Sequence, residues 1–448
     1  MRRRLLIGFG LVSVGAAFAY AVAIAVGFAT VPAFESLLAP ARPPIVVGLL
    51  HSKTGPMAIS ETSLIDAEVL ALEEINAEGG VAGRRLTWFI RDGRSDASVF
   101  ASEARRLIET DKAGVLFGCY TAESRKAVKA VVEERGSLLL IPSNFEGMED
   151  PTRVIYGGGS SNQSVIPAVR WCFDALKSRR FFVIGTEELW SRCASEIAKD
   201  AVKAVGAEVA GEAYLPLAGV EVDQAVEAIR ASKADVVLNL MVGDSNLPYY
   251  AAIRRAGLTP ATVPTVAFGF SEDELRRFPA GDVTGHYAAC NYFQSVDRSE
   301  NREFVRKFKA RYGQDRVTSD PIVAAYDLVK LWAQTAREVE TDEALVVIDH
   351  IGRQSLDAPE GIITIDAESL VAWRPFHVGR ARADGQFDIV WSLTKPIHPL
   401  NYVGTRPVSE WRAFVDGLQA RWGGRWSTAG GPTPAPAPAT SRASDTTK

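Results

Sequence analysis

The feature that most constrains the fold is a regular alternation of short apolar runs with amphipathic helical patterns. Ile45–Leu50 has the length and composition of a buried strand, and Ser63–Glu78 then carries apolar residues at helical spacing before it stops at Gly79-Gly80. Further strand-like runs, each followed by a helical segment, lie at Leu86–Ile90, Val115–Phe117, Leu138–Ile141, Phe181–Ile184, Glu208–Leu215, Val236–Leu240 and Thr265–Phe268. Strands that alternate with helices form parallel sheets covered by helices, so the pattern predicts an α/β fold.

The alternation occurs in two consecutive runs, separated by the glycine-rich stretch Tyr156–Ser164. Two runs of similar length predict two similar lobes, each a parallel sheet flanked by helices. Helical patterns at Glu300–Tyr312 and Pro321–Glu338 and strand-like segments at Gly361–Ile365, Phe376–Arg382 and Phe387–Trp391 complete the folded region. Ligands of parallel sheets bind at the carboxyl ends of the strands, so the cleft between the lobes is the expected pocket.

The N-terminus has the pattern of an export segment. Arg2, Arg3 and Arg4 precede an uncharged, mostly apolar run from Leu5 to Phe34, which is long enough to span a bilayer. An uncleaved anchor and a cleaved signal both fit this pattern, and both export the rest of the chain. We therefore expect a periplasmic or otherwise extracytoplasmic protein, held at the inner membrane by residues 5–31 if the segment is retained.

The composition excludes several classes of protein. Lys+Arg 50 against Asp+Glu 54 gives a net charge of −4, so no basic surplus points to nucleic acid. The 4 Cys and 5 His lack metal-ligand spacing, and no phosphate-binding or dinucleotide-binding glycine motif follows a strand. We expect no metal, no cofactor and no catalytic group. Cys172 and Cys193 lie on successive predicted helices, where a disulfide is compatible with an oxidising compartment.

Polar clusters follow four of the predicted strands. They are Gly118–Ser124, Pro142–Phe145, Gly185–Trp190 and Val242–Asn246. Backbone N–H groups at such strand-to-helix turns point at small polar ligands, but the same residue types also cap helices. For any single residue the two interpretations remain open, whereas four clusters that converge on one cleft favour a ligand site.

Several segments resemble the urea and short-chain-amide branch of the type I periplasmic binding proteins. They include VGLLHSKTGPMAISETSLIDAEVLALEEINAEGGVAGRRL (47–86), LFGCYTAESRKAVKAVVEERGSLLLIPSNFEG (116–147), VIYGGGSSNQ (154–163), VGDSN (242–246), NYFQSVD (291–297), VTSDPIVAAYDLVKLW (317–332) and ADGQFDIVWSLTKPIHPLNY (383–402). The resemblance covers about residues 45–405, in the order of the family. The family includes receptors of urea ABC transporters and an amide sensor that controls amidase expression.

The resemblance implies two lobes joined by three crossover strands. On this basis we expect an export signal or anchor with a linker at 1–42, lobe 1 at 43–158 plus 288–358, lobe 2 at 159–287 plus 359–410, a C-terminal helical extension at 411–426 and a tail at 427–448. That tail is rich in Gly, Pro, Ala, Ser and Thr, a composition typical of disorder.

The resemblance also implies a pocket. The expected ligand-binding residues are Tyr120, Thr121, Ala122, Ser143, Asn144, Glu187, Glu188, Trp190 and Asp244. This chain departs from the family at Ala122, where a small hydroxyl residue is usual, and at Ile141 and Phe145, where tyrosines are usual. Glu187 and Glu188 could instead favour a ligand with an amine.

We therefore expect a solute-binding protein that closes on urea, an amide or an amino acid and delivers it to an ABC permease. A sensor that works with a membrane signalling protein is the alternative, and dimers occur in the family. An amidase that uses Cys119 or the Glu187/Glu188 pair lacks a base placed by the sequence. A purely structural protein with an empty cleft is a further alternative.

Overall fold

The computed structural model describes residues 42–217 and 219–428. The described residues from Ile45 onward form one compact unit. The expected export segment and residues 429–448 of the expected tail lie outside the described residues. Within the described ranges, no helix has both the length and the apolar character needed to cross a bilayer.

The first sheet contains five parallel strands in the order β2-β1-β3-β4-β5. They are β1 (Ile45–His51), β2 (Leu86–Asp92), β3 (Val115–Gly118), β4 (Leu138–Ile141) and β5 (Val154–Tyr156). Alternate residues point to opposite faces, so Val115 and Phe117 join one core while Leu116 joins the other. Because both faces are covered, the inner strands β3 and β4 are fully buried, whereas the edge strand β2 is largely exposed or half-buried.

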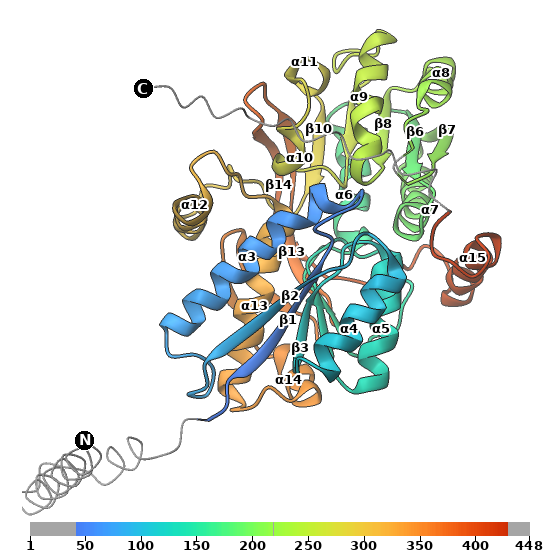
Figure 1. The fold of residues 1–448 in the computed structure, drawn as a ribbon. Coiled ribbons are helices and arrows are strands. Elements are labelled where there is room, and N and C mark those ends of the chain that lie inside the picture. Colours follow the sequence, from blue (N-terminus) through green and yellow to red (C-terminus); the bar gives the residue numbers. More distant parts are fainter. Residues whose placement is uncertain (1–41, 218, 429–448) are drawn as a thin grey trace, which may run out of the picture. The chain divides into compact units, whose positions relative to one another are not determined.

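Helices from two distant parts of the chain cover this sheet (Figure 1). On one face lie α4 (Ala97–Glu109) and α5 (Ala122–Arg135). On the other lie α3 (Ala58–Ala77), α12 (Ser299–Tyr312), α13 (Asp320–Glu338) and α14 (Ala344–Ile351). The helix α3 begins at Ala58, before the expected start at Ser63; Ser63 lies inside the helix, and its hydroxyl donates to Asp273.

The second sheet contains nine strands in the order β11-β12-β13-β10-β9-β8-β6-β7, with β14 paired to β13. They are β6 (Arg180–Thr186), β7 (Glu208–Leu215), β8 (Val236–Leu240), β9 (Thr265–Ala267), β10 (Tyr287–Cys290), β11 (Leu356–Ala358), β12 (Gly361–Ile365), β13 (Ala372–Ala381) and β14 (Phe387–Ile397). Strands β6 to β10 are parallel, whereas β11 to β14 add antiparallel pairs. The two-lobed α/β prediction is confirmed, but this sheet is mixed because the short turn from β13 to β14 permits only an antiparallel pair.

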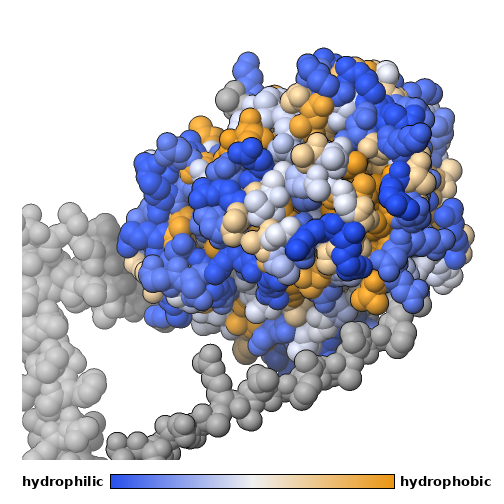
Figure 2. Space-filling view, turned by 90° about the horizontal axis from the view of Figure 1, so that it is seen from above, coloured by the Kyte–Doolittle hydropathy of each residue, from blue (hydrophilic) through white to orange (hydrophobic). Residues whose placement is uncertain are grey.

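The helices of the second lobe also lie on both faces of its sheet. One core includes α6 (Ser161–Asp174), α7 (Leu189–Ala204) and α15 (Val408–Arg421), and the other includes α8 (Asp223–Ser232) and α9 (Asn246–Arg255). Three short helical elements, η1 (Gly243–Ser245), α10 (Glu272–Leu275) and α11 (Ala280–Val283), occupy loops. On the surface shown in Figure 2, hydrophilic and hydrophobic residues are interspersed.

The crossing between the lobes that follows β5 lies against one buried arginine. Arg374 on β13 donates to Asp320 at the start of α13 (2.7 Å) and to the carbonyl of Gly157 after β5 (2.9 Å). Its guanidinium also lies 2.8 Å from Glu360. The carboxylates balance a charge that would be costly to bury alone. At this junction a Cβ on Gly158 would lie 2.0 Å from the carbonyl oxygen of Ser143, so the glycine-rich stretch serves close packing of the crossing.

Candidate functional site

A strained turn after β3 places three of the expected site residues at the cleft. Gly118 has φ +146°, and a Cβ there would lie 1.9 Å from the carbonyl oxygen of Leu50. Cys119 also has a positive φ of 67°, and its N–H donates to the same carbonyl (2.9 Å). Only glycine fits the first position. The turn directs Tyr120 toward the second lobe and starts α5, where the Thr121 hydroxyl accepts from the N–H of Ser124 (3.2 Å).

The structure brings seven of the nine expected residues to one inner cavity of about 30 Å³. The lining comprises Tyr120, Thr121, Ala122, Ser143, Asn144, Glu188, Trp190, Val242 and Gly269. A second cavity of about 20 Å³ shares Tyr120 and Asn144 and extends to Phe270, Cys290 and Asp320. The residues come from both lobes, and they lie at the carboxyl ends of strands, as parallel sheets predict.

Two residues after β4 organise the first lobe's side of the cavity. Ser143 donates its hydroxyl to the carbonyl of Tyr120 (2.8 Å), which joins the loops after β3 and β4. The Asn144 amide donates to the carbonyl of Phe268 (3.1 Å), directly after β9. Asn144 therefore links the two lobes inside the cleft.

On the second lobe, Glu188 caps α7. Its carboxylate accepts from the N–H groups of Trp190 (2.9 Å) and Ser191 (2.6 Å). Burial raises the pKa of Glu188 to about 8, although these backbone hydrogen bonds act in the opposite direction. The side chain of Trp190 is buried, and its indole N–H has no hydrogen-bond partner in the described part of the chain. Because buried donors are rarely left unpaired, this N–H is a candidate ligand contact.

The structure does not bring Glu187 and Asp244 to these cavities. The Glu187 carboxylate lies 3.7 Å from the Arg192 guanidinium, on the rim of the β6–α7 turn. Asp244 lies in η1, where partial burial raises its pKa. Both residues follow the carboxyl end of a strand, where ligand-binding residues of parallel sheets are expected, but their side chains do not line either inner cavity.

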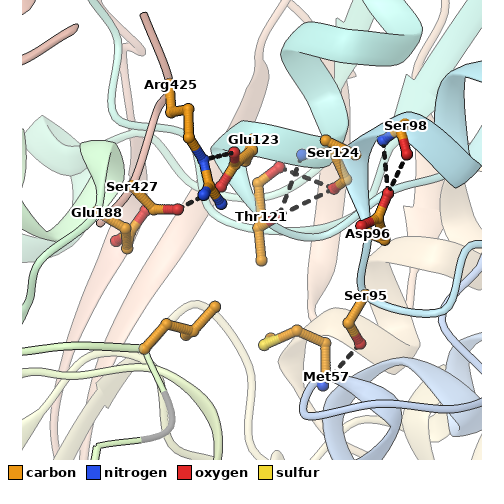
Figure 3. A pocket seen from close by; sticks show the side chains of 12 residues that line it. Met57, Ser95, Asp96, Ser98, Thr121, Glu123, Ser124, Glu188, Arg425 and Ser427 are labelled. Atoms are coloured by element: carbon orange, nitrogen blue, oxygen red, sulfur yellow. Dashed lines mark hydrogen bonds and ion pairs between the residues drawn. The ribbon is translucent and has the colours of Figure 1, made fainter. Parts of the chain in front are cut away.

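A larger outer cavity of about 310 Å³ adjoins the inner one and shares Thr121 and Glu188 with it (Figure 3). Its other walls are Met57, the Ser95–Ser98 turn, Glu123, Ser124, Leu217, Arg425 and Ser427. The expected ligand-binding residues did not include Ser95–Ser98, although this turn follows β2 and therefore satisfies the strand-end rule, by which ligands bind at the carboxyl ends of parallel strands. They also did not include Arg425 and Ser427, whose neighbours have the composition of a disordered tail.

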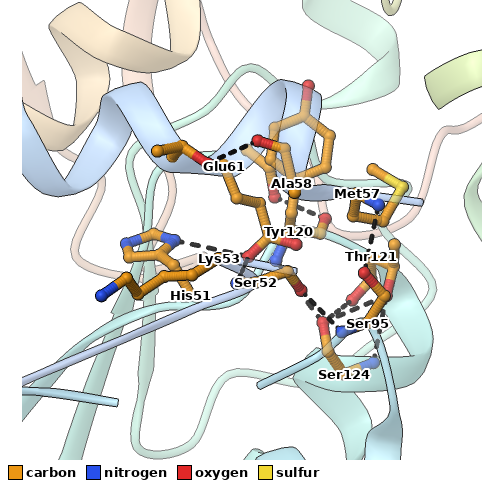
Figure 4. Close-up of polar contacts among 12 residues, drawn as sticks. His51, Ser52, Lys53, Met57, Ala58, Glu61, Ser95, Tyr120, Thr121 and Ser124 are labelled. Atoms are coloured by element: carbon orange, nitrogen blue, oxygen red, sulfur yellow. Dashed lines mark hydrogen bonds and ion pairs between the residues drawn. The ribbon is translucent and has the colours of Figure 1, made fainter. Parts of the chain in front are cut away.

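A buried charge cluster holds the loop after β1 (Figure 4). The His51 ring lies 2.8 Å from Glu68 and 3.5 Å from Glu61. Burial alone would lower the pKa of His51, but the two carboxylates raise it to about 10, so the ring is charged at neutral pH. Glu61 accepts from the N–H of Ser52 (2.7 Å), and Ser52 accepts from the N–H of Ser95 (3.0 Å). This chain of contacts positions the Ser95 wall of the outer cavity.

The lobes also touch beside the cleft, where α3 meets α10. Ser60 donates to Glu274 (2.5 Å), and Ser63 donates to Asp273 (2.7 Å). Burial raises the pKa of Glu274 to about 7. With the Asn144 contact, these bonds define a closed arrangement of the lobes.

The described residues contain no group of acidic, histidine and cysteine side chains that could hold a metal ion. All four cysteines are buried free thiols, so Cys172 and Cys193 do not pair. Burial raises the pKa of the Cys119 thiol well above its usual value, which disfavours the nucleophilic thiolate.

Two curated relatives differ in how much of the chain they match. "Leu/Ile/Val-binding protein homolog 7" of Brucella abortus is 23% identical over 305 residues, which is 64% of this chain and 75% of the relative. "Limonene hydroxylase" of Geobacillus stearothermophilus is 36% identical, but over only 115 residues, or 26% of this chain and 21% of that relative. Such a short match carries no activity to this chain.

A solved structure shares the fold. A solute-binding protein of an ABC transporter from Rhodopseudomonas palustris, in complex with 3,4-dihydroxybenzoic acid, superposes with a TM-score of 0.72 at 17% identity. The match covers 79% of this chain and 98% of that protein. The periplasmic binding protein domain, as a family, matches residues 45–408. With its two α/β lobes, three crossings and a cleft between them, the chain belongs to the family of periplasmic binding protein domains.

Proposed function

We propose that this protein is an exported solute-binding protein that closes its lobes on a small polar ligand and delivers it to an ABC transporter. The family membership and the name of the Brucella relative support this role. The geometry supports it because polar groups of both lobes surround one cleft. Ligand binding then favours closure through hydrogen bonds that only the closed form offers. A sensor would use the same closure, and transport of the ligand by cells that carry or lack the gene separates the two roles.

The proposed ligand is urea or a short-chain amide. The observation that carries this proposal is the unpartnered indole N–H of Trp190, a buried donor on a residue of the inner cavity. A carbonyl oxygen is its natural acceptor. The inner cavities are a few tens of Å³, a size that suits a molecule of few atoms better than an aromatic acid.

An amine-bearing ligand is less well supported. With a pKa of about 8, the Glu188 carboxyl is mostly protonated at neutral pH, and its oxygens cap α7. It therefore offers little negative charge to an ammonium group.

Thermal unfolding of the full chain in the presence of acetamide, urea, L-leucine or 4-hydroxybenzoate tests the proposal. A ligand at about 100 times its dissociation constant raises the free energy of unfolding by about 2.7 kcal/mol. We expect acetamide or urea to raise the midpoint, and the Trp190→Phe variant to weaken that response about tenfold or more because the ligand carbonyl loses its donor. Stabilisation by leucine or the benzoate alone would contradict the amide proposal, and no stabilisation by any compound would contradict small-solute binding.

A further inference from the structure

The C-terminal segment Arg425–Thr428 lies across the cleft, from one lobe to the other. The family match ends at residue 408, so both α15 and this segment follow the family domain. The helix α15 lies beside α7 of the second lobe (Figure 1), and Arg406, just before it, pairs with Glu196 and Asp200 at 2.8 Å. The helix also contacts the first lobe, because Arg412 donates to Asp150 in the loop after β4 (2.8 Å). Trp411 and Trp422 are buried in the core that α15 shares with α6 and α7.

Beyond α15 the chain attaches to the turn that carries Glu187 and Glu188. The N–H of Leu189 donates to the carbonyl of Trp426 (3.0 Å), and the N–H of Thr428 donates to the carbonyl of Glu187 (3.0 Å). Ser427 and Glu188 form an antiparallel bridge between these bonds. The segment is therefore joined to the second lobe by a single β-bridge at the rim of the cleft.

Side chains of the segment Arg425–Thr428 contact the first lobe. Arg425 donates to the Glu123 carboxylate (3.3 Å), and the Ser427 hydroxyl donates to the other oxygen of the same carboxylate. The Lys126 ammonium lies 4.8 Å from the centre of the Trp426 ring. Glu123 and Lys126 both belong to the first turns of α5, the helix that follows Tyr120 and Thr121. In Figure 3, Arg425 and Ser427 converge on Glu123 at the wall of the outer cavity.

We propose that Arg425–Thr428 is an interlobe latch: it is fixed to the second lobe by its backbone, holds α5 of the first lobe by its side chains, and forms a wall of the outer ligand cavity. Opening of the lobes must break the contacts to Glu123 and Lys126. The latch therefore raises the closed population and slows ligand release. The statement about release rests on the proposed function, whereas the statement about closure does not.

Distance measurements between spin labels on the full chain test the closure. Because all four native cysteines are buried, Thr87→Cys on β2 and Gln224→Cys on α8, both exposed, can be labelled selectively. In this doubly labelled protein, Glu123→Ala removes both acceptors of the latch from the first lobe, and Arg425→Ala/Ser427→Ala removes both donors. Glu133→Ala is the matched control, because Glu133 lies on the same helix and contacts only Lys129 among the ion pairs of the described residues.

We expect both latch variants to shift the ligand-free distance distribution toward longer or broader distances, while the control keeps the parent distribution. Combining Glu123→Ala with Arg425→Ala/Ser427→Ala should add no further shift, since the two changes break the same contacts. An unchanged distribution in either latch variant, or an equal shift in the control, would overturn the proposal. Unchanged thermal midpoints would show that each variant is folded.

Acetamide serves as the probe for release. We expect the latch variants to raise both the dissociation rate and the dissociation constant of acetamide about tenfold, which corresponds to about 1.4 kcal/mol. If acetamide does not bind the parent protein, the proposed ligand is wrong and the distance result alone decides the latch. If acetamide binds all variants equally although the distances shift, the claim about release is overturned.

Discussion

Two contacts that join the lobes lie on different sides of the cleft, and they differ in chemistry. At the α3 side, Ser60 donates to Glu274, and both residues are buried within the family domain. At the latch, Arg425 and Ser427 contact Glu123, and the Arg425 side chain is 51% exposed. A buried carboxyl is sensitive to its protonation, whereas a half-exposed ion pair is sensitive to salt. The same closure is therefore governed by two different solution variables.

A change of pH should have the largest effect, and it should act at the α3 side. Glu274 has a pKa of about 7 in the closed form, against 4.5 for an exposed glutamate. Between these values the open form releases a proton that the closed form keeps, so closure weakens as the pH rises, by at most tenfold per pH unit. We expect the ratio of closed to open molecules, measured with the labels at Thr87→Cys and Gln224→Cys, to fall from pH 5 to pH 8 by up to roughly a hundredfold. Glu274→Gln should make this dependence less steep and leave the part due to Glu188, which lines the cleft with a pKa of about 8. A profile equally steep in that variant would assign the dependence to groups other than Glu274.

Removal of the hydroxyl at the α3 side should have the next largest effect. Ser60→Ala leaves the buried Glu274 carboxyl without its donor, which costs about 1–3 kcal/mol, or roughly tenfold or more in closure. The matched control is Thr62→Ala on the same helix, because the Thr62 hydroxyl bonds only within α3. Equal distance distributions for the two variants would show that the α3 contact does not hold the lobes together.

High salt should weaken the latch more than the α3 contact. Exposed ion pairs contribute at most about 1 kcal/mol, and salt screens them. Raising the sodium chloride concentration from 0.05 M to 1 M should therefore reduce the closed population by no more than about fivefold. The reduction should be smaller in Arg425→Ala and absent when Arg412→Ala, which removes the exposed Arg412–Asp150 pair, is added. Persistence of the salt effect in the combined variant would locate it elsewhere.

The smallest expected effect is at the ring of Trp426. Trp426→Leu keeps an apolar side chain but removes the cation–π contact with Lys126, worth about 0.5–1 kcal/mol. Closure should fall about two- to fivefold. A loss larger than that of Glu123→Ala would mean that ring packing, rather than the carboxylate, carries the latch.

The central strands could be predicted from the sequence because burial on both faces leaves a continuous apolar run. Val236–Leu240 and Leu138–Ile141 occur at the predicted bounds. The strands β5, β10 and β11 were missed, since their formation depends on pairing with other segments rather than on a local pattern. The strand-end rule found Tyr120, Ser143 and the β6–α7 turn, because it follows from the topology of parallel sheets.

The latch could not be predicted for a related reason. Ser427 follows a glycine-containing turn and precedes a Pro/Ala-rich stretch, so its composition indicates disorder. Its place is set by backbone bonds to Glu187 and Leu189, some 240 residues away, and no local pattern records them. The role of Glu188 was also open in the sequence, because a cap and a ligand contact need the same residue types.

The order of the segments in the first lobe has a consequence for how the chain matures. Its core joins residues of β1 to β5 with Tyr292, α12, α13 and α14, which follow more than 130 residues later. On the face that α3 covers, the first sheet therefore lacks the rest of its cover until residues up to about Ile351 are available. Contacts of such long sequence separation form slowly. A nascent chain of this order remains incompletely folded through most of its synthesis, a state that suits a polypeptide threaded through a narrow channel before it folds.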